Sequence, residues 1–353
     1  MMKISLSPSR RGFAVIIVLV AITVLSILAG ALALFMKVES QLAQNSNDGE
    51  KLLWIARGGV ERACWILAQE PQGPSSLQQI WAGGPGDGPE TNSPLMGITL
   101  DDFPVGDGSV SLKMIEQESK VNINTADVEM LHNVLTTMGV DASDISLVTD
   151  SILDWIDPDD ATKPAGAESD YYQGLNPPYN AKNAPIDDIQ ELQFIKGVTP
   201  EMFKGGSAEG TDSPFKKHKL GFGHAPGEAA DYPFGLRDVF TPYSIGKINI
   251  NTADTNVLAL IPGMDTASIQ NLMAMRSSEG GFGDGTGVIR DLSQLSAVVP
   301  NQLALQQISR YCTVRGETYE VHATARAGAS QREFVAVVYR TGHNVQVVGF
   351  HPK

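Results

Sequence analysis

The chain has 353 residues and only two cysteines, Cys64 and Cys312, which lie far apart in the sequence. No Cys-x-x-Cys pair is present, and this absence excludes the common cysteine-based zinc sites. We interpret the two cysteines as buried free thiols. A disulfide bridge formed in an oxidising compartment is the alternative.

Basic residues are scarce relative to acidic ones. The chain has 26 lysines and arginines against 40 aspartates and glutamates, which gives a net charge of −14. Binding to nucleic acid without sequence preference requires lysine and arginine side chains that neutralise phosphates. We therefore do not expect nucleic acid as a partner.

Motifs for catalysis are also missing. The six histidines are scattered along the chain, and no Gly-x-Ser-x-Gly sequence occurs. The sequence therefore predicts that the protein is not an enzyme. A membrane-tethered, metal-dependent hydrolase that uses an acidic loop is the least favoured alternative.

The first segment with a clear signal is an uncharged apolar run from Phe13 to Met36. A helix of that length measures roughly 36 Å and can cross a hydrocarbon core of about 30 Å. Lys3, Arg10 and Arg11 precede the run, so the N-terminus is expected in the cytoplasm and the bulk in the periplasm, with a single pass through the inner membrane. A cleaved signal peptide is the alternative, but its small-residue site at 31–33 would lie inside the apolar run.

Apolar residues continue at helical spacing beyond the run, and Pro71 ends the pattern. We predict one helix from about Phe13 to Gln69, although Gly58-Gly59 weakens its middle. Alternating residues predict a strand at 109–115 and about three strands after 310. The residues between these strands have helical patterns that interrupt the sheet.

An internal repeat lies within this helical middle. Eight of the twelve positions in 120–131 are identical in 247–258, and both copies contain the sequence Asn-Ile-Asn-Thr-Ala-Asp. Each copy resembles a helix start, in which Asn124 or Thr125 is expected to cap the helix and Asp127 to lie in its first turn.

Each copy is followed by a glycine turn, Gly139–Asp141 or Gly263–Asp265, and then by a second helix. This arrangement resembles the helix-hairpin-helix unit of DNA-binding proteins, whose Gly-x-Gly hairpin offers backbone N–H groups to phosphate. An aspartate replaces the second glycine here and would repel phosphate, so we favour a structural use of the repeat. A membrane-anchored DNA-binding or DNA-uptake protein is the alternative.

Carboxylates are concentrated in a loop between the two copies. Five of them fall within residues 157–170, opposed by Lys163 alone: Asp157, Asp159, Asp160, Glu168 and Asp170. Calcium accepts six to eight oxygen ligands in flexible geometry and would relieve their repulsion, although the spacing is not that of an EF-hand. The residues alone leave calcium binding and a solvated acidic loop equally open.

The junction Arg10-Arg11-Gly12-Phe13 resembles the leader junction of type IV pilins and pseudopilins. The resemblance implies that a prepilin peptidase cuts after Gly12 and methylates the new N-terminal Phe13. Most members of that family carry glutamate at the fifth mature position, where this chain has Ile17. A subunit without that carboxylate is poorly suited to stack in the usual way, which indicates the tip of a filament.

Further segments extend the resemblance over nearly the whole chain. The leader junction, Asp154–Asp160, Gly166–Tyr172, Pro178–Asn183 and Glu191-Leu192 together look like the minor pseudopilin of the K class in type II secretion systems. The resemblance implies a place at the pseudopilus tip, initiation of pseudopilus assembly, I-class and J-class pseudopilins as partners, and structural calcium in the acidic loop. It makes the five carboxylates the candidate ligands.

The fold implied by the resemblance is α+β. A pilin-like fold, with a long N-terminal helix packed on a small antiparallel sheet, carries a large all-α domain of helix-hairpin-helix or SAM-like type inserted between strands. The expected layout is a leader at 1–12, a transmembrane helix at 13–36, its periplasmic part at 37–70, a loop at 71–107, a strand at 108–120, the inserted domain at 121–310 and strands at 311–353. Residues 204–235, which include the basic run Lys216–Lys219, are interpreted as a solvated insertion.

Overall fold

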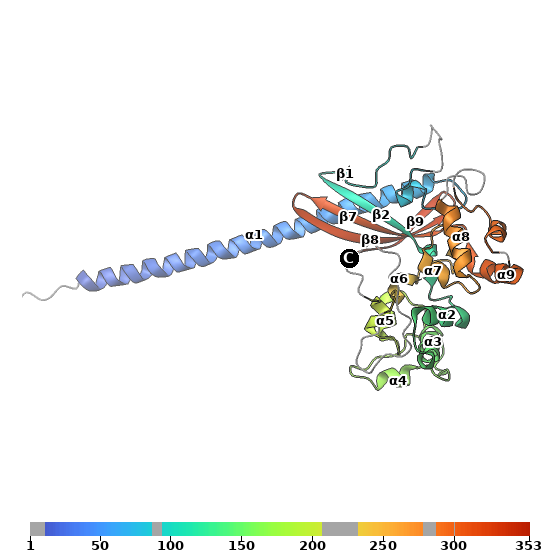
Figure 1. The fold of residues 1–353 in the computed structure, drawn as a ribbon. Helices are drawn as coiled ribbons and strands as arrows, with labels where there is room; N and C mark the ends of the chain where they lie inside the picture. Colours follow the sequence, from blue (N-terminus) through green and yellow to red (C-terminus); the bar gives the residue numbers. More distant parts are fainter. Residues whose placement is uncertain (1–10, 87–93, 207–231, 278–286, 300) are drawn as a thin grey trace, which may run out of the picture.

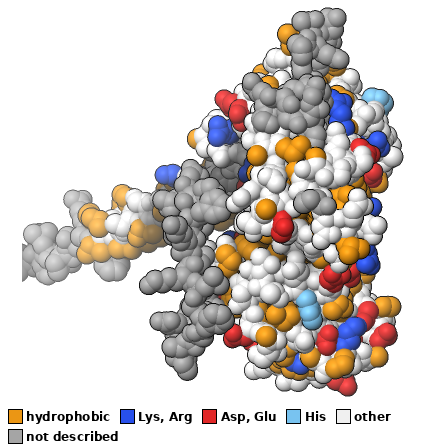
Figure 2. Space-filling view, turned by 45° about the vertical axis from the view of Figure 1, so that its right-hand side comes forward, with side chains coloured by type: hydrophobic (Ala, Val, Ile, Leu, Met, Phe, Trp, Pro, Cys, Tyr) orange, Lys and Arg blue, Asp and Glu red, His pale blue; other side chains and the backbone are white. Residues whose placement is uncertain are grey.

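The N-terminal part of the molecule is one long helix. The structure is a computed structural model that describes residues 11–86, 94–206, 232–277, 287–299 and 301–353. Helix α1 spans Arg11–Gln69, and its first part projects away from the rest of the protein (Figure 1). This is the one helix in the described residues that is long and apolar enough to cross a membrane. Figure 2 shows hydrophobic side chains along the projecting part and a mixed surface on the body.

The second half of α1 packs on an antiparallel sheet with the strand order β1-β2-β7-β8-β9. The strands are β1 (Phe103–Val105), β2 (Gly108–Glu116), β7 (Thr318–Ala327), β8 (Ser330–Thr341) and β9 (Asn344–Pro352). The prediction of a long helix on an antiparallel sheet is therefore confirmed. Strand β1 lies inside the segment 71–107, which was predicted as a loop. The sequence did not reveal this strand, because three residues in a segment rich in glycine and proline give no strand signal.

Gly58 and Gly59 place α1 close to the sheet. A Cβ atom on Gly58 would lie 2.8 Å from Val105 Cγ1, and one on Gly59 would lie 2.8 Å from Val110 Cγ2. Neither contact leaves room for a side chain. The two glycines lower the helix propensity of this segment, but they allow the helix to pack tightly on β1 and β2.

The chain between β2 and β7 forms a helical part with a hydrophobic core of its own. Its α-helices are α2 (Val128–Met138), α3 (Ala142–Ile156), α4 (Ser169–Gln173), α5 (Pro200–Lys204), α6 (Leu236–Val239), α7 (Thr255–Ala259), α8 (Thr266–Ser277) and α9 (Gln302–Tyr311). Short 3₁₀-helices are η1 (Ile80–Ala82) before β1, η2 (Gln117–Ser119) after β2, η3 (Ile189–Phe194) and η4 (Leu292–Ala297). Cys64 lies in the core under the sheet and Cys312 in the helical core, and both are free thiols.

The helical part is not all-α as expected. It contains two parallel pairs of two-residue strands, β3 (Val121–Asn122) with β4 (Phe240–Thr241), and β5 (Ile248–Asn249) with β6 (Cys312–Thr313). Both pairs begin in the repeated sequence. Runs of two residues are too short to produce a periodic pattern, so the sequence did not reveal them.

The repeat forms two units with the same hydrogen bonds. The Asn124 side chain accepts from Ile186 N (2.7 Å) and donates to Ile186 O (3.0 Å), and Asn251 does the same with Ile289 N and Ile289 O (2.9 Å each). We call each of these pairs of hydrogen bonds an asparagine tie. In each unit the tie is followed by a 3₁₀-helix with a capping box, η3 in the first and η4 in the second. The sequence repeat of twelve residues is thus the start of a longer structural repeat.

The predicted helix caps are wrong by a few residues. Asp127 is the N-cap of α2 and accepts from Met130 N at 2.9 Å, and Asp254 caps α7 in the same way at 2.8 Å from Val257 N. The asparagine predicted as a cap instead holds a distant segment. An aspartate and an asparagine are both good caps, so sequence alone does not decide between them.

Two buried glutamates, Glu116 and Glu118, connect the helical part to the sheet, and we call them the junction pair. Glu116 is 1% exposed, and its Oε1 accepts from Ser75 Oγ (3.1 Å) and Asn249 Nδ2 (2.6 Å). Its Oε2 has no hydrogen-bond partner among the residues that the structure describes. Burial, assisted by the nearby Glu118 charge, raises the pKa of Glu116 to about 8.

Glu118 is fully buried and is satisfied by backbone donors. It accepts from the N–H groups of Ile245, Glu317 and Thr318, each at 3.2 Å. Burial nevertheless raises the pKa of Glu118 above its ordinary value. Since Ile245 belongs to the helical part and Thr318 begins β7, this carboxylate ties the two parts together.

Candidate metal centre

The acidic loop begins where α3 ends and returns toward α3 before α4. Asp157 is the C-cap of α3, and Glu168 is the N-cap of α4. A Cβ atom on Gly166 would collide with Asp154 Oδ2, so glycine at this position allows the returning chain to pack on α3. The adjacent Ala167 is buried at 1% exposure, and this packing turns Glu168 inward.

Three of the five predicted ligands come together, and we call them the acidic centre: Asp157, Asp159 and Glu168. One carboxylate oxygen from each lies within 4.8 Å of the others. Asp157 is half-buried, Asp159 is exposed, and Glu168 is only 3% exposed. A cation placed among these oxygens would be open to solvent on the Asp159 side.

Several buried oxygens around the acidic centre have no partner. Asp157 Oδ1 and both oxygens of Glu168 accept no hydrogen bond in the described structure. Burial, with the repulsion of Asp154 next, raises the pKa of Glu168 to about 7. Buried carboxylate oxygens without donors are costly, and a bound cation would satisfy them.

The other two predicted ligands do not join this group. The Asp160 side chain is exposed, and its Oδ1 accepts from Asn183 Nδ2 at 2.9 Å. Asp170 is exposed in the first turn of α4. Both aspartates add negative charge near the centre, but the structure does not place them among its clustered oxygens.

Asn183 is a neighbour that the candidate ligand set missed. Its Nδ2 donates to Asp159 O and to Asp160 Oδ1, both at 2.9 Å, while its buried Oδ1 has no partner in the described part of the chain. Its φ of 47° lies in the left-handed region, which asparagine tolerates. The only signal in the sequence was its place at the end of the Pro178–Asn183 segment.

Two lysines hold the loop in place. The Lys163 ammonium contacts Asp157 Oδ2 and lies 3.1 Å from the buried Asp154 Oδ1. Lys196 Nζ donates to Gly166 O at 3.0 Å and lies over the Tyr171 ring. Neither lysine contacts Glu168 or Asp159, so the acidic centre keeps its excess of negative charge.

The residues present suit a hard cation. The donors of the acidic centre and Asn183 Oδ1 are all oxygens, with no histidine or cysteine among them. Calcium prefers carboxylate and amide oxygens and tolerates irregular geometry, whereas zinc prefers nitrogen and sulfur. The site therefore fits the predicted calcium, with Asp157, Asp159 and Glu168 as the first candidates.

The predicted leader junction cannot be described at the level of side chains. Residues 1–10 lie outside the described structure, and the Phe13 side chain is outside it as well. Ile17 lies within α1 and is 55% exposed. The position that usually carries glutamate is thus on the projecting part of the helix.

Comparison with known proteins finds a match to one family model. Residues 109–205 match the family model described as type II secretion system (T2SS), protein K. The predicted resemblance to the K class is confirmed. The matched range starts in β2 and includes the acidic loop and η3.

Curated relatives carry the same name. The type II secretion system protein K of *Aeromonas hydrophila* is 27% identical over 223 residues, which are 56% of this chain and 62% of that protein. The *Pectobacterium carotovorum* protein is 21% identical over 367 residues and covers 96% of this chain and 95% of its own. The *Pseudomonas aeruginosa* protein is 23% identical over 310 residues, with 83% and 80% covered.

A solved structure shares the fold. It is the crystal structure of the GspK-GspI-GspJ complex from the enterotoxigenic Escherichia coli type 2 secretion system. The match has a TM-score of 0.63 and a sequence identity of 16%, and it covers 88% of this chain and 99% of that chain. The combination of a long N-terminal helix, an antiparallel sheet and a helical part is therefore a known architecture.

Proposed function

We propose that this chain is a minor pseudopilin at the tip of a type II secretion pseudopilus, where it initiates pseudopilus assembly and supports protein secretion across the outer membrane. The observation that carries the proposal is the architecture of a pilin-like stem with a large helical part between β2 and β7. The helical part lies below the sheet and around the end of the sheet that is farthest from the projecting part of α1 (Figure 1). Its bulk would block a further subunit from stacking above it.

The proposed partners are the I-class and J-class minor pseudopilins. The support is the matched structure, whose chains are GspK, GspI and GspJ. To test this, the full chain is produced together with both partners and extracted in mild detergent. We expect the three to purify as one complex, and an unrelated single-span protein to be absent from it. Failure to associate with either partner would reject the assignment.

The proposed membrane topology follows from α1. The leader 1–12 is cytoplasmic, residues 13–36 cross the inner membrane, and the body lies in the periplasm. A prepilin peptidase is the proposed processing partner, with cleavage between Gly12 and Phe13. Mass spectrometry of the mature protein should find a methylated Phe13 at the N-terminus, and a strain without the peptidase should retain the leader.

We propose calcium as a structural ion in the acidic centre rather than as a catalytic one. Titration calorimetry with Ca²⁺, Mg²⁺ and Zn²⁺ tests this assignment. Tighter binding of Ca²⁺ is expected, because all the candidate donors are oxygens. Tighter binding of Zn²⁺ or Mg²⁺ would instead support the hydrolase alternative.

The geometry does not favour the DNA-binding alternative. Asp265 Oδ1 accepts from Ser268 N at 2.7 Å at the start of α8. A phosphate bound at this helix start would need the same N–H group, which the carboxylate already occupies. We expect the protein to show no salt-dependent binding to duplex DNA. Such binding at low salt would revive the alternative.

A further inference from the structure

An open cleft of about 760 Å³ lies between the sheet and the helical part. Strands β7, β8 and β9 form one side, while η3, α5, α6 and β4 form the other. Its apolar lining consists mainly of Phe203, Phe240, Val335 and Val337, all nearly buried. The volume is in the range of clefts that bind ligands.

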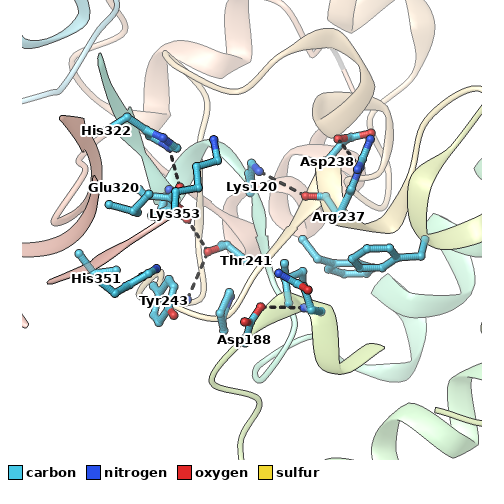
Figure 3. Close-up of a pocket in the computed structure, with 18 of the residues that line it drawn as sticks. Lys120, Asp188, Arg237, Asp238, Thr241, Tyr243, Glu320, His322, His351 and Lys353 are labelled. Atoms are coloured by element: carbon cyan, nitrogen blue, oxygen red, sulfur yellow. Dashed lines mark hydrogen bonds and ion pairs between the residues drawn. The ribbon is translucent and has the colours of Figure 1, made fainter. Parts of the chain in front are cut away.

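Four cationic side chains line this cleft: Lys120, Lys204, Arg237 and Lys353. Figure 3 shows Lys120 between the Glu320–His322 pair and Arg237. Strand β7 places His322 next to Glu320, whose Oε1 is 2.7 Å from His322 Nε2. The cleft lining thus has four cations against three carboxylates, in a chain whose net charge is −14.

The three carboxylates in the lining are already engaged. Asp188 caps η3 and accepts from Gln190 N at 2.9 Å. Asp238 accepts from Gly235 N at 3.1 Å, and Glu320 pairs with His322. Their charges are therefore partly compensated within the protein.

Two of the four cations, Lys120 and Lys204, have no such ion-pair partner among the described residues. No carboxylate in the described residues lies within ion-pair distance of Lys120 or Lys204, although Lys120 is near enough to Glu320 to lower the pKa of that carboxyl. Among the described residues, Lys120 Nζ donates only to Arg237 O, at a long 3.4 Å. The side chains of Gln190 and Gln193 on the same cleft make no hydrogen bond within the described structure and can pair with a peptide backbone.

We propose that this cleft binds an extended, acidic segment of a partner polypeptide. Its carboxylates would pair with Lys120 and Lys204, its apolar side chains would cover the exposed Tyr243 ring, and its backbone would pair with the glutamine amides. Charge complementarity favours an acidic occupant, because the unpaired groups of the cleft are cations and amides. This inference does not depend on the proposed role at a pseudopilus tip.

The test uses the full chain in detergent micelles and a fluorescein-labelled peptide that alternates glutamate with leucine. Fluorescence anisotropy measures the affinity at low salt. We expect saturable binding that weakens severalfold between about 50 and 500 mM NaCl, since the pairs are solvent-exposed. The double variant Lys120→Glu/Lys204→Glu should bind at least about tenfold more weakly.

Two controls keep the test specific. Lys51→Glu, an exposed lysine on α1 away from the cleft, should bind like the parent chain. A peptide with glutamine in place of glutamate should bind at least about tenfold more weakly to the parent. The milder variant Lys120→Gln/Lys204→Gln serves if charge reversal disturbs folding. Equal binding by the parent and both double variants, or photo-crosslinking of the peptide outside the cleft, would overturn the proposal, as would no binding at millimolar peptide.

Discussion

The acidic centre and the junction pair are both groups of carboxylates, yet the protein handles their charge in opposite ways. In the junction pair, backbone N–H groups satisfy Glu118, and burial raises the pKa of Glu116 to about 8 so that it holds its proton at neutral pH. In the acidic centre, Glu168 is similarly hidden from solvent, but neither of its oxygens accepts a hydrogen bond from the described residues. Within the described residues, only Glu116 Oε2 of the junction pair lacks a partner, whereas Asp157 Oδ1 and both Glu168 oxygens of the acidic centre lack one. The proposed calcium ion would supply what the acidic centre lacks.

The largest expected effect comes from adding calcium. Saturating Ca²⁺ should raise the melting temperature of the body by on the order of 5–10 °C, because binding at about a hundred times Kd adds nearly 3 kcal/mol to stability. Glu168→Gln should remove most of this rise. In EGTA the same variant should melt above the parent chain, because it removes a buried charge that no donor satisfies. If it melts below the parent in EGTA as well, Glu168 is satisfied without calcium.

Removing Glu118 should have the next largest effect. Glu118→Ala leaves the three N–H groups of Ile245, Glu317 and Thr318 without their acceptor, and we expect a loss of about 2–4 kcal/mol in the free energy of unfolding. Glu118→Gln keeps one acceptor oxygen and should lose less. Chemical denaturation at fixed calcium measures both, and equal losses would show that the hydrogen bonds are not the cause.

Glu116→Gln should stabilise the protein in a manner that depends on pH. The pKa of Glu116 is about 8 in the folded state against 4.5 as its ordinary value, so the folded state binds the proton more tightly. Its contribution to stability is therefore complete below about pH 4.5 and is lost as the pH rises to about 8. The variant should gain about 1–3 kcal/mol over the parent at pH 8 and little at pH 4.5. A difference that does not change with pH would contradict the burial of this charge.

The smallest effects should come from the two exposed aspartates. Asp160→Asn and Asp170→Asn should each change the calcium-dependent rise in melting temperature by only about 1–2 °C, because their carboxylates lie outside the acidic centre. Differential scanning fluorimetry with and without calcium measures the change. A loss as large as that of Glu168→Gln would make them ligands, as the resemblance first implied.

Much of the fold could be predicted from patterns that depend on neighbours in sequence. The apolar run and the helical spacing gave α1, and alternation gave β2 and the three C-terminal strands. Composition made all five carboxylates of the acidic loop candidates, but it did not single out Asp157, Asp159 and Glu168, which the structure brings together. The repeat was visible because twelve positions can be compared directly.

The rest depends on contacts between distant residues. Asn183 reaches the acidic centre only because its loop returns to Asp159 with a left-handed backbone. In the sequence, Glu116 and Glu118 are two glutamates at the end of a strand with no sign that they are buried. Their burial follows from packing of the helical part on the sheet. The cap of α2 is Asp127 rather than Asn124 because Ile186 engages the asparagine.

The matching hydrogen bonds of Asn124 and Asn251 show that the two repeat units close in the same way around segments of different length. The segment enclosed by the first tie runs from Asn124 to Ile186 and contains the acidic loop, whereas the segment enclosed by the second runs only from Asn251 to Ile289. This is the arrangement that tandem duplication of one unit, followed by a change of loop length in one copy, would leave. The second unit therefore serves as a natural reference for the first, and it shows that the shared scaffold closes without the acidic loop.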